Sequence, residues 1–233
     1  MFSYRAWEKV WIYRNTFSLG LLNTVKTSVL GILLALVIGL ILGLMATSGN
    51  KLLKTIARVY VEIIQNTPVL LQCCFLYYYL AFSGHSMGII ATGVVALGIY
   101  TGAYMAEVFR AGIEAIPKGQ GEAAHSQGFN YFETMYLVIL PQTIKIILPP
   151  MVNQVVNLIK NTSCLYIIGG ADLISLTYSF VTGENTGGAY APAYIISGLL
   201  FFIICFPLSK FASTWESYLK KKEQRVNTAV KEA

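Results

Sequence analysis

Three amide side chains, Gln154, Asn157 and Asn161, stand in an otherwise apolar part of the chain. Their spacing of three and four residues puts them on one face of a helix, about two turns long. Lys160 lies beside them. Amides donate and accept hydrogen bonds, and polar groups at membrane depth are costly unless they are paired or face a cavity. We interpret this face as the lining of a path for a polar solute. Hydrogen bonding between helices is the alternative.

Two other apolar segments carry polar residues that could line the same path: Gln65, Asn66, Thr67, Tyr100 and Thr101. The first group precedes Pro68, which lacks a backbone donor, so a helix should kink or break there. Irregular backbone at membrane depth survives only where it is buried in protein or lines a cavity. In the second segment, Tyr100 shares one helical face with two further polar residues, Tyr104 and Glu107.

A mostly polar stretch, 119–141, lies between strongly apolar ones and predicts a docking surface. Residues 122–127 are good helix formers, and Gly128 is typical of the position just past a helix end. The small residues Ala123 and Ala124 would let a partner approach closely, and Glu122 could bind a cationic group. An ordinary loop between helices is the alternative.

The composition predicts an all-α, polytopic membrane protein. Of 233 residues, 55% are hydrophobic and 12% charged, whereas charged residues make up about 25% of a soluble domain. Five segments are long and apolar enough to cross a membrane: about 19–46, 56–82, 88–109, 138–170 and 192–211. Three prolines, Pro141, Pro149 and Pro150, should interrupt the fourth segment. A polar, Gly-rich loop at 171–191, with Asp172 and Glu184, should separate it from the fifth. We expect an interfacial segment at 1–18, a transmembrane domain at 19–215 with a docking loop at about 110–134, and a basic tail at 216–233.

The distribution of Lys and Arg predicts the orientation. Eleven of these residues flank the segment ends on the side of the docking loop, and four lie on the other side. Because cytoplasmic loops carry the excess of positive charge, the docking loop and C-terminus should lie inside and the N-terminus outside. The basic N-terminal segment goes against this rule.

The remaining reactive residue types predict no catalytic, cofactor or metal site. Cys73, Cys74, Cys164 and Cys205 all lie in apolar runs without a CxxC pair, which favours a role as small core residues. The two histidines, His85 and His125, have no suitable neighbours. The net charge of +6 comes from residues between apolar runs and at the C-terminus, as is typical of membrane-flanking charges rather than a nucleic-acid surface.

The docking stretch resembles the EAA loop of bacterial ABC importer permeases, and longer motifs at 62–72, 100–120, 140–150 and 160–163 resemble the polar amino acid uptake branch. The resemblance implies a five-helix type I permease fold in the bacterial cell membrane. It also implies that the loop forms a coupling helix that sits in a cleft of an ATPase. The residues it assigns to that coupling are Glu122, Ala123, Ala124, Gly128, Leu140 and Pro141.

Further partners follow from the resemblance: a second permease, identical or a sister chain, and an extracytoplasmic solute-binding protein. The chain has no Walker A sequence, so the ATPase subunit would bind and hydrolyse ATP. The family often has Arg at position 65, and its cationic amino acid importers often have acids at 154 and 161. The amides of Gln65, Gln154 and Asn161 therefore favour a neutral or zwitterionic substrate, such as glutamine, asparagine, cystine or glutamate, over arginine or lysine.

An ion-coupled secondary transporter of small polar solutes is the main alternative. Such a protein should show internal repeats or chains of intramembrane acids, and neither is evident. A structural membrane anchor would not explain the polar face or the docking loop. A membrane enzyme would need a nucleophile–base pair or a metal-ligand cluster, and the sequence offers none.

Overall fold

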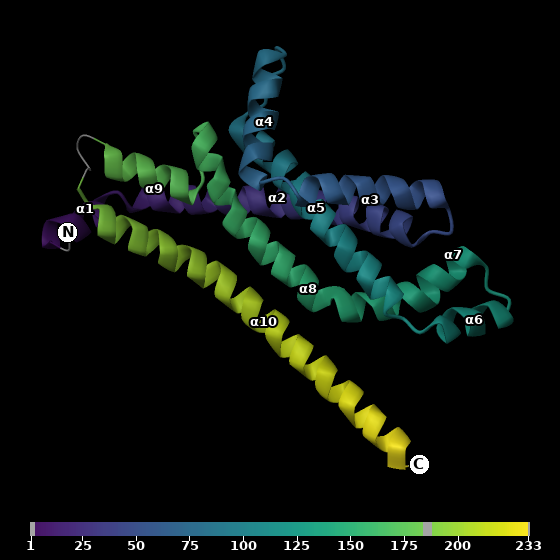
Figure 1. The fold of residues 1–233 in the computed structure, drawn as a ribbon. Coiled ribbons are helices and arrows are strands. Elements are labelled where there is room, and N and C mark those ends of the chain that lie inside the picture. The colour runs from purple at the N-terminus through teal and green to yellow at the C-terminus, as the bar shows by residue number, and fades with distance from the viewer. Residues whose placement is uncertain (1–2, 184–187, 233) are drawn as a thin grey trace.

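The computed structural model describes residues 3–183 and 188–232, with side chains described as far as Lys222, and this part is built of helices without strands (Figure 1). The elements in chain order are α1 (Tyr4–Ile12), α2 (Arg14–Thr47), α3 (Lys51–Gln65), α4 (Val69–Phe82), α5 (Ile89–Glu114), α6 (Lys118–Ser126), α7 (Tyr131–Glu133), the π-helix η1 (Thr134–Ile139), α8 (Leu140–Asn161), the 3₁₀-helix η2 (Thr162–Ile168), α9 (Leu173–Thr182) and α10 (Tyr190–Glu232).

Four helical stretches are long and apolar enough to cross a membrane: Arg14–Thr47, Ile89–Glu114, Tyr131–Ile168 and Tyr190–Lys222. The pair α3 and α4 brings the number to five if it counts as one broken span, because it passes the same test together. The two helices meet at an angle of 98°. The all-α membrane architecture and the break at Pro68 are therefore confirmed.

Polar side chains around the break donate hydrogen bonds to carbonyls in the last turn of α3. Asn66 Nδ2 donates to the carbonyl of Glu62 at 2.7 Å, and Thr67 Oγ1 donates to the carbonyl of Ile63 at 3.0 Å. From α4, Gln72 Nε2 reaches back to Thr67 Oγ1 at 2.7 Å. A helix end buried without such partners would be costly. The polar run before the proline thus builds the bend itself.

Helices α2 and α5 pack closely against each other. A Cβ atom added to Gly39 would stand 2.4 Å from Cβ of Met105, and one added to Gly43 would stand 2.6 Å from Cβ of Phe109. Two glycines of α5 receive side chains of α2 in the same way. The Gly39–Gly43 pair therefore serves close packing rather than flexibility.

The prediction that prolines interrupt the fourth segment is wrong. Pro141 stands in the first turn of α8, where its missing donor costs little, and α8 runs on through Pro149 and Pro150. Pro149 cannot donate to the carbonyl of Lys145, four residues earlier. That carbonyl instead accepts a hydrogen bond of 3.3 Å from Nε1 of Trp215 on α10. A neighbouring helix thus supplies a donor that the proline cannot.

Part of the expected polar loop 171–191 is helical as well. Asp172 caps α9, accepting hydrogen bonds from the backbone N–H of Ile174 at 3.0 Å and from Oγ of Ser175. Its side chain is buried, and burial raises the pKa of the carboxyl although these hydrogen bonds act to lower it. Glu184, also assigned to this loop, lies outside the described residues.

Replacing Asp172 with alanine should destabilise the junction between α9 and α2. The change removes the cap of α9, which is typically worth about 1 kcal/mol, and leaves buried donors without an acceptor. Beside the cap, Asn23 Nδ2 of α2 donates to the carbonyl of Ala171 at 2.9 Å, so the disturbance should reach α2. A lower thermal unfolding midpoint in detergent would support this account. Asp172→Asn, which keeps the acceptor, should lie close to the wild type.

Helix α1 packs one face onto the rest of the chain and exposes the other. Ala6 and Val10 are buried in a cluster with Phe17 of α2, whereas Trp11 is 70% exposed and Trp7 is also exposed. The interfacial segment expected at 1–18 stays a prediction, and its first two residues lie outside the described part.

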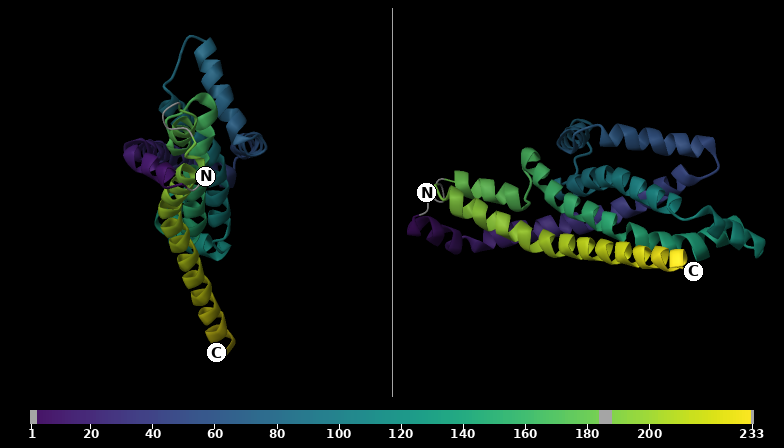
Figure 2. Two further views of the ribbon diagram at one scale, coloured as in Figure 1. Left: turned by 90° about the vertical axis from the view of Figure 1, so that its left-hand side faces the viewer. Right: turned by 60° about the horizontal axis from the view of Figure 1, so that its bottom comes forward.

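The two ends of the long axis carry different elements. The N-terminus and α9 lie at one end, while α6, α7, the α2–α3 connection and the C-terminus lie toward the other (Figures 1 and 2). The expected docking loop and basic tail therefore share one side of the molecule. The tail continues α10, and the side chains of Arg225 and Lys231 within it lie outside the described part.

Candidate functional site

A pocket of about 520 Å³ between α3, α5 and α8 brings together two of the amides assigned to the solute path. Gln65 comes from the end of α3 and Gln154 from α8, with Tyr104 and Glu107 of α5 beside them. We call this the amide pocket. Sequence spacing could group residues only within one helix, so only the fold shows that Gln65 and Gln154 line the same pocket.

The amides of α8 are open to a ligand or a partner. Within the described residues, none of the side chains of Gln154, Asn157 and Asn161 forms a hydrogen bond, and Asn157 is exposed.

 Asn161 lies one turn further along α8 and is half-buried. Polar groups of this kind that are left unpaired inside one chain need a partner from elsewhere.

The other residues assigned to the path lie in different surroundings. Tyr100 OH stands 3.2 Å from Tyr104 OH, with the two ring centroids 5.1 Å apart, so Tyr100 adjoins the amide pocket through Tyr104. Thr101 is buried, with 2% of its surface exposed, on the packed side of α5. Asn66 and Thr67 hold the break between α3 and α4, as described above.

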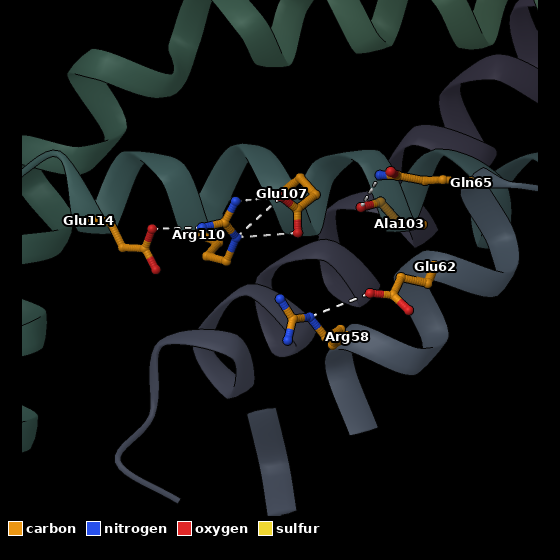
Figure 3. A network of polar contacts seen from close by, with 7 residues as sticks. All are labelled: Arg58, Glu62, Gln65, Ala103, Glu107, Arg110 and Glu114. Atoms are coloured by element: carbon orange, nitrogen blue, oxygen red, sulfur yellow. Dashed lines mark hydrogen bonds and ion pairs between the residues drawn. The ribbon is translucent and has the colours of Figure 1, made fainter. Parts of the chain in front are cut away.

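A second hollow, of about 550 Å³, lies between α3 and α5 (Figure 3). Six charged side chains line it, and we call it the charged groove: Lys54, Arg58 and Glu62 from α3, and Glu107, Arg110 and Glu114 from α5. In the sequence, the Lys and Arg residues of this groove contributed only to the predicted orientation of the chain in the membrane. The signal that was missed is the pattern of opposite charges three and four residues apart on two helices.

The ion pairs in the charged groove join neighbours on the same helix. Arg110 contacts Glu107 and Glu114 at 2.6 Å each, and Arg58 Nε lies 3.4 Å from Glu62 (Figure 3). No ion pair joins α3 to α5 within the described residues. Between these helices, Gln65 Nε2 donates to the carbonyl of Ala103 at 3.4 Å.

The amide pocket and the charged groove adjoin. Gln65 and Glu107 line both of them.

The expected docking helix exists and ends as its sequence predicts. Gly128 has φ +89°, a left-handed conformation that favours glycine. Its N–H donates to the carbonyl of His125 at 2.9 Å, and the N–H of Phe129 donates to the carbonyl of Ala124 at 3.1 Å. This pair of hydrogen bonds is a Schellman motif, which turns the chain sharply after α6.

The exposed face of α6 carries Glu122 and Ala123, while Ala124 is buried. After the turn, Asn130 and Glu133 form a capping box that starts α7. The π-helix η1 then leads to Leu140 and Pro141 at the start of α8, so the chain forms a helical hairpin around the turn. The residues that the resemblance assigns to coupling thus lie on the two arms and the turn of one hairpin.

Comparison with known proteins identifies the class of this chain. Residues 21–212 match the family described as "Binding-protein-dependent transport system inner membrane component". The chain belongs to this family. It is a membrane-integral permease component of a transporter and not an enzyme, and permeases of this kind work with an ATPase and a substrate-binding protein.

Curated relatives agree with the family assignment. The chain is 37% identical over 202 residues to the probable glutamine ABC transporter permease protein GlnM of Bacillus subtilis (strain 168), covering 87% of this chain and 92% of that one. It is 36% identical over 186 residues to the putative glutamine transport system permease protein GlnP of Rickettsia felis (strain ATCC VR-1525 / URRWXCal2), covering 79% and 84%.

Solved structures agree with the fold. An amino acid ABC transporter crystallised with histidines superposes with a TM-score of 0.78 at 35% identity, covering 88% of this chain and 95% of that chain. The MetNI methionine ABC transporter in an inward-facing conformation gives a TM-score of 0.66 at 16% identity, covering 88% and 97%, and supports the fold alone. The family membership excludes the alternative of an ion-coupled secondary transporter.

Proposed function

We propose that this permease carries a neutral, zwitterionic amino acid of the glutamine class. The observation that carries the proposal is the amide pocket, which Gln65 and Gln154 both line. An amide can donate and accept at once, so two amides match a carboxamide side chain without placing an uncompensated charge beside it. The names of the relatives, which include glutamine permeases, support the same class.

Coupling to the ATPase is assigned to the hairpin around Gly128. The exposed side of α6, with Glu122 and Ala123, offers a small and acidic surface to a partner. Leu140 and Pro141 fix where α8 begins on the other arm. When the ATPase moves the bound helix α6, the movement would therefore be transmitted to α8 as well as to α5.

A second permease, identical or a sister chain, completes the proposed assembly around a central path. The unpaired amides of Asn157 and Asn161 support it, because they lack partners within the described residues of one chain. In the proposed orientation the N-terminus lies outside and the C-terminus inside. The position of the two termini toward opposite ends of the long axis supports this arrangement (Figure 1).

Changing Gln154 to glutamate should shift the preference of the transporter toward cationic amino acids. The new carboxylate would stand in the amide pocket with Glu107, and a charge-assisted hydrogen bond to a guanidinium or ammonium group is worth more than a neutral one. We expect arginine to compete about tenfold better for glutamine import than in the wild type. The measurement is competition in proteoliposomes that contain the permease, its ATPase and its binding protein.

Asn153→Asp provides the matched control, because Asn153 is exposed on α8 and does not line the amide pocket. It adds the same charge one residue away and should leave competition by arginine unchanged. Equal competition in wild type and Gln154→Glu would contradict the assignment of the amide pocket to substrate.

A further inference from the structure

The two walls of the charged groove carry opposite net charges. The α3 wall has two cations, Lys54 and Arg58, and one anion, Glu62. The α5 wall has one cation and two anions. The groove as a whole is therefore neutral, with a positive wall facing a negative one.

The charges of the groove are available to a ligand. The side chains of Arg58 and Glu62 are 80% and 65% exposed, so their ion pair is a surface pair. Such pairs contribute little and can exchange partners readily. Arg110 is more enclosed, but Glu114 beside it is 54% exposed. Neither wall pairs with the other, which leaves the space between them open to an occupant.

We propose that the charged groove is a second binding site, which holds the backbone groups of a zwitterionic amino acid on its way out of the amide pocket. The carboxylate of the amino acid binds the α3 wall through Arg58 and Lys54. Its ammonium group binds the α5 wall through Glu114 and Glu107. The volume of about 550 Å³ lies within the range of small-molecule sites.

This inference rests on the proposed function for the direction of travel, but its recognition chemistry is different. The amide pocket selects the side chain, whereas the groove contacts only the groups that all free α-amino acids share. Glu107 and Gln65 line both spaces, so the ammonium group can remain on Glu107 while the side chain leaves the amide pocket. The groove should accordingly bind glycine, which has no side chain to select.

The groove is also placed to respond to the ATPase. Only residues 115–117 separate the end of α5 from the start of α6. A displacement of α6 therefore moves the end of α5 that carries Glu114. The hydrogen bonds that join α3 to α5 lie away from that end, at the carbonyls of Ala103 and Ile99. Widening the groove would separate the two charged walls and weaken the hold on a ligand that bridges them, because Coulomb attraction falls with distance.

The test uses glycine as the probe and the purified permease–ATPase complex in lipid nanodiscs, without the binding protein, which itself binds amino acids. Saturation-transfer NMR should detect weak glycine binding. N-acetylglycine lacks the ammonium group and glycinamide lacks the carboxylate. Each should therefore bind with an affinity lower than that of glycine by about tenfold or more. No detectable glycine binding, or equal binding of the three compounds, would overturn the proposal.

Charge reversal locates the site. Arg58→Glu makes both walls negative and Glu114→Arg makes both positive, so each should lower the affinity for glycine about tenfold or more. The double variant exchanges the signs of the walls and should recover most of the binding, with the ligand reversed. A purely structural role predicts no recovery, because residue 58 would still face Glu62 with a like charge.

Lys220→Gln breaks an exposed ion pair with Glu216 far along α10 and serves as the matched control. It should leave glycine binding unchanged. Glycine binding should also persist in Gln154→Ala, which alters only the amide pocket. If the groove proposal is wrong, glycine will bind equally well to the wild type and to the Arg58→Glu and Glu114→Arg variants. If the proposed substrate class is wrong, only the import competition measured with Gln154→Glu will differ from the expected result.

Discussion

Gly128→Asp should release the permease from its ATPase. At φ +89°, an aspartate is strained, and relaxing that strain breaks the Schellman motif that ends α6. The helix then points differently from the surface of its partner, and the new carboxylate adds a desolvation cost in the interface. We expect a mild-detergent pull-down of the tagged permease to lose the ATP-hydrolysing subunit. Glu122→Lys, which reverses the exposed charge on α6, should have the same effect.

Gly84→Asp controls for strain alone, because Gly84 also has a left-handed backbone, with φ +77°, and lies in the loop between α4 and α5. Neither glycine has a neighbour within 4 Å of an added Cβ. The ATPase should remain bound to this variant. Its loss from both variants would mean that general misfolding, and not the hairpin, explains the result.

Gly39→Ala should have the largest effect on folding. The single added carbon would stand 2.4 Å from Cβ of Met105 and 3.1 Å from its backbone carbonyl carbon, so α2 and α5 must separate. Overpacking of this kind typically costs about 1–3 kcal/mol. The yield of monodisperse protein in size-exclusion chromatography should fall sharply, and the thermal unfolding midpoint with it.

Gly198→Ala is the matched control for this prediction. Gly198 also lies within a long membrane helix, α10, but an added Cβ would meet nothing within 4 Å. Alanine favours helices over glycine, so this variant should be at least as stable as the wild type. Equal losses in both variants would contradict the role of Gly39 in close packing.

The sequence predicts best those features that depend on local backbone chemistry. The break at Pro68 and the end of the helix before Gly128 each follow from the conformational limits of one residue. The continuity of α8 could not be predicted, because the donor that replaces the missing N–H of Pro149 comes from Trp215, on another helix.

The candidate site was only partly predictable for the same reason. Gln154 was recognised as polar within an apolar helix. Gln65, which lines the same pocket, lies on α3, and the sequence does not show where α3 packs relative to α8. Thr67 looked like a path residue because it is polar, while its hydroxyl group in fact supports the bend after α3. The opposite charges three and four residues apart mark one face on α3 and one on α5, but their spacing does not show that the two faces share a groove.

The hydrogen bond from Trp215 to Lys145 gives the protein an intrinsic optical probe. The chain has three tryptophans, and the other two, Trp7 and Trp11, stand on α1 toward the opposite end of the long axis. Replacing those two with phenylalanine would leave a single indole, positioned where α8 and α10 meet. Its emission wavelength would follow the polarity around the ring, so nucleotide-driven separation of the two helices could be timed without attaching a label.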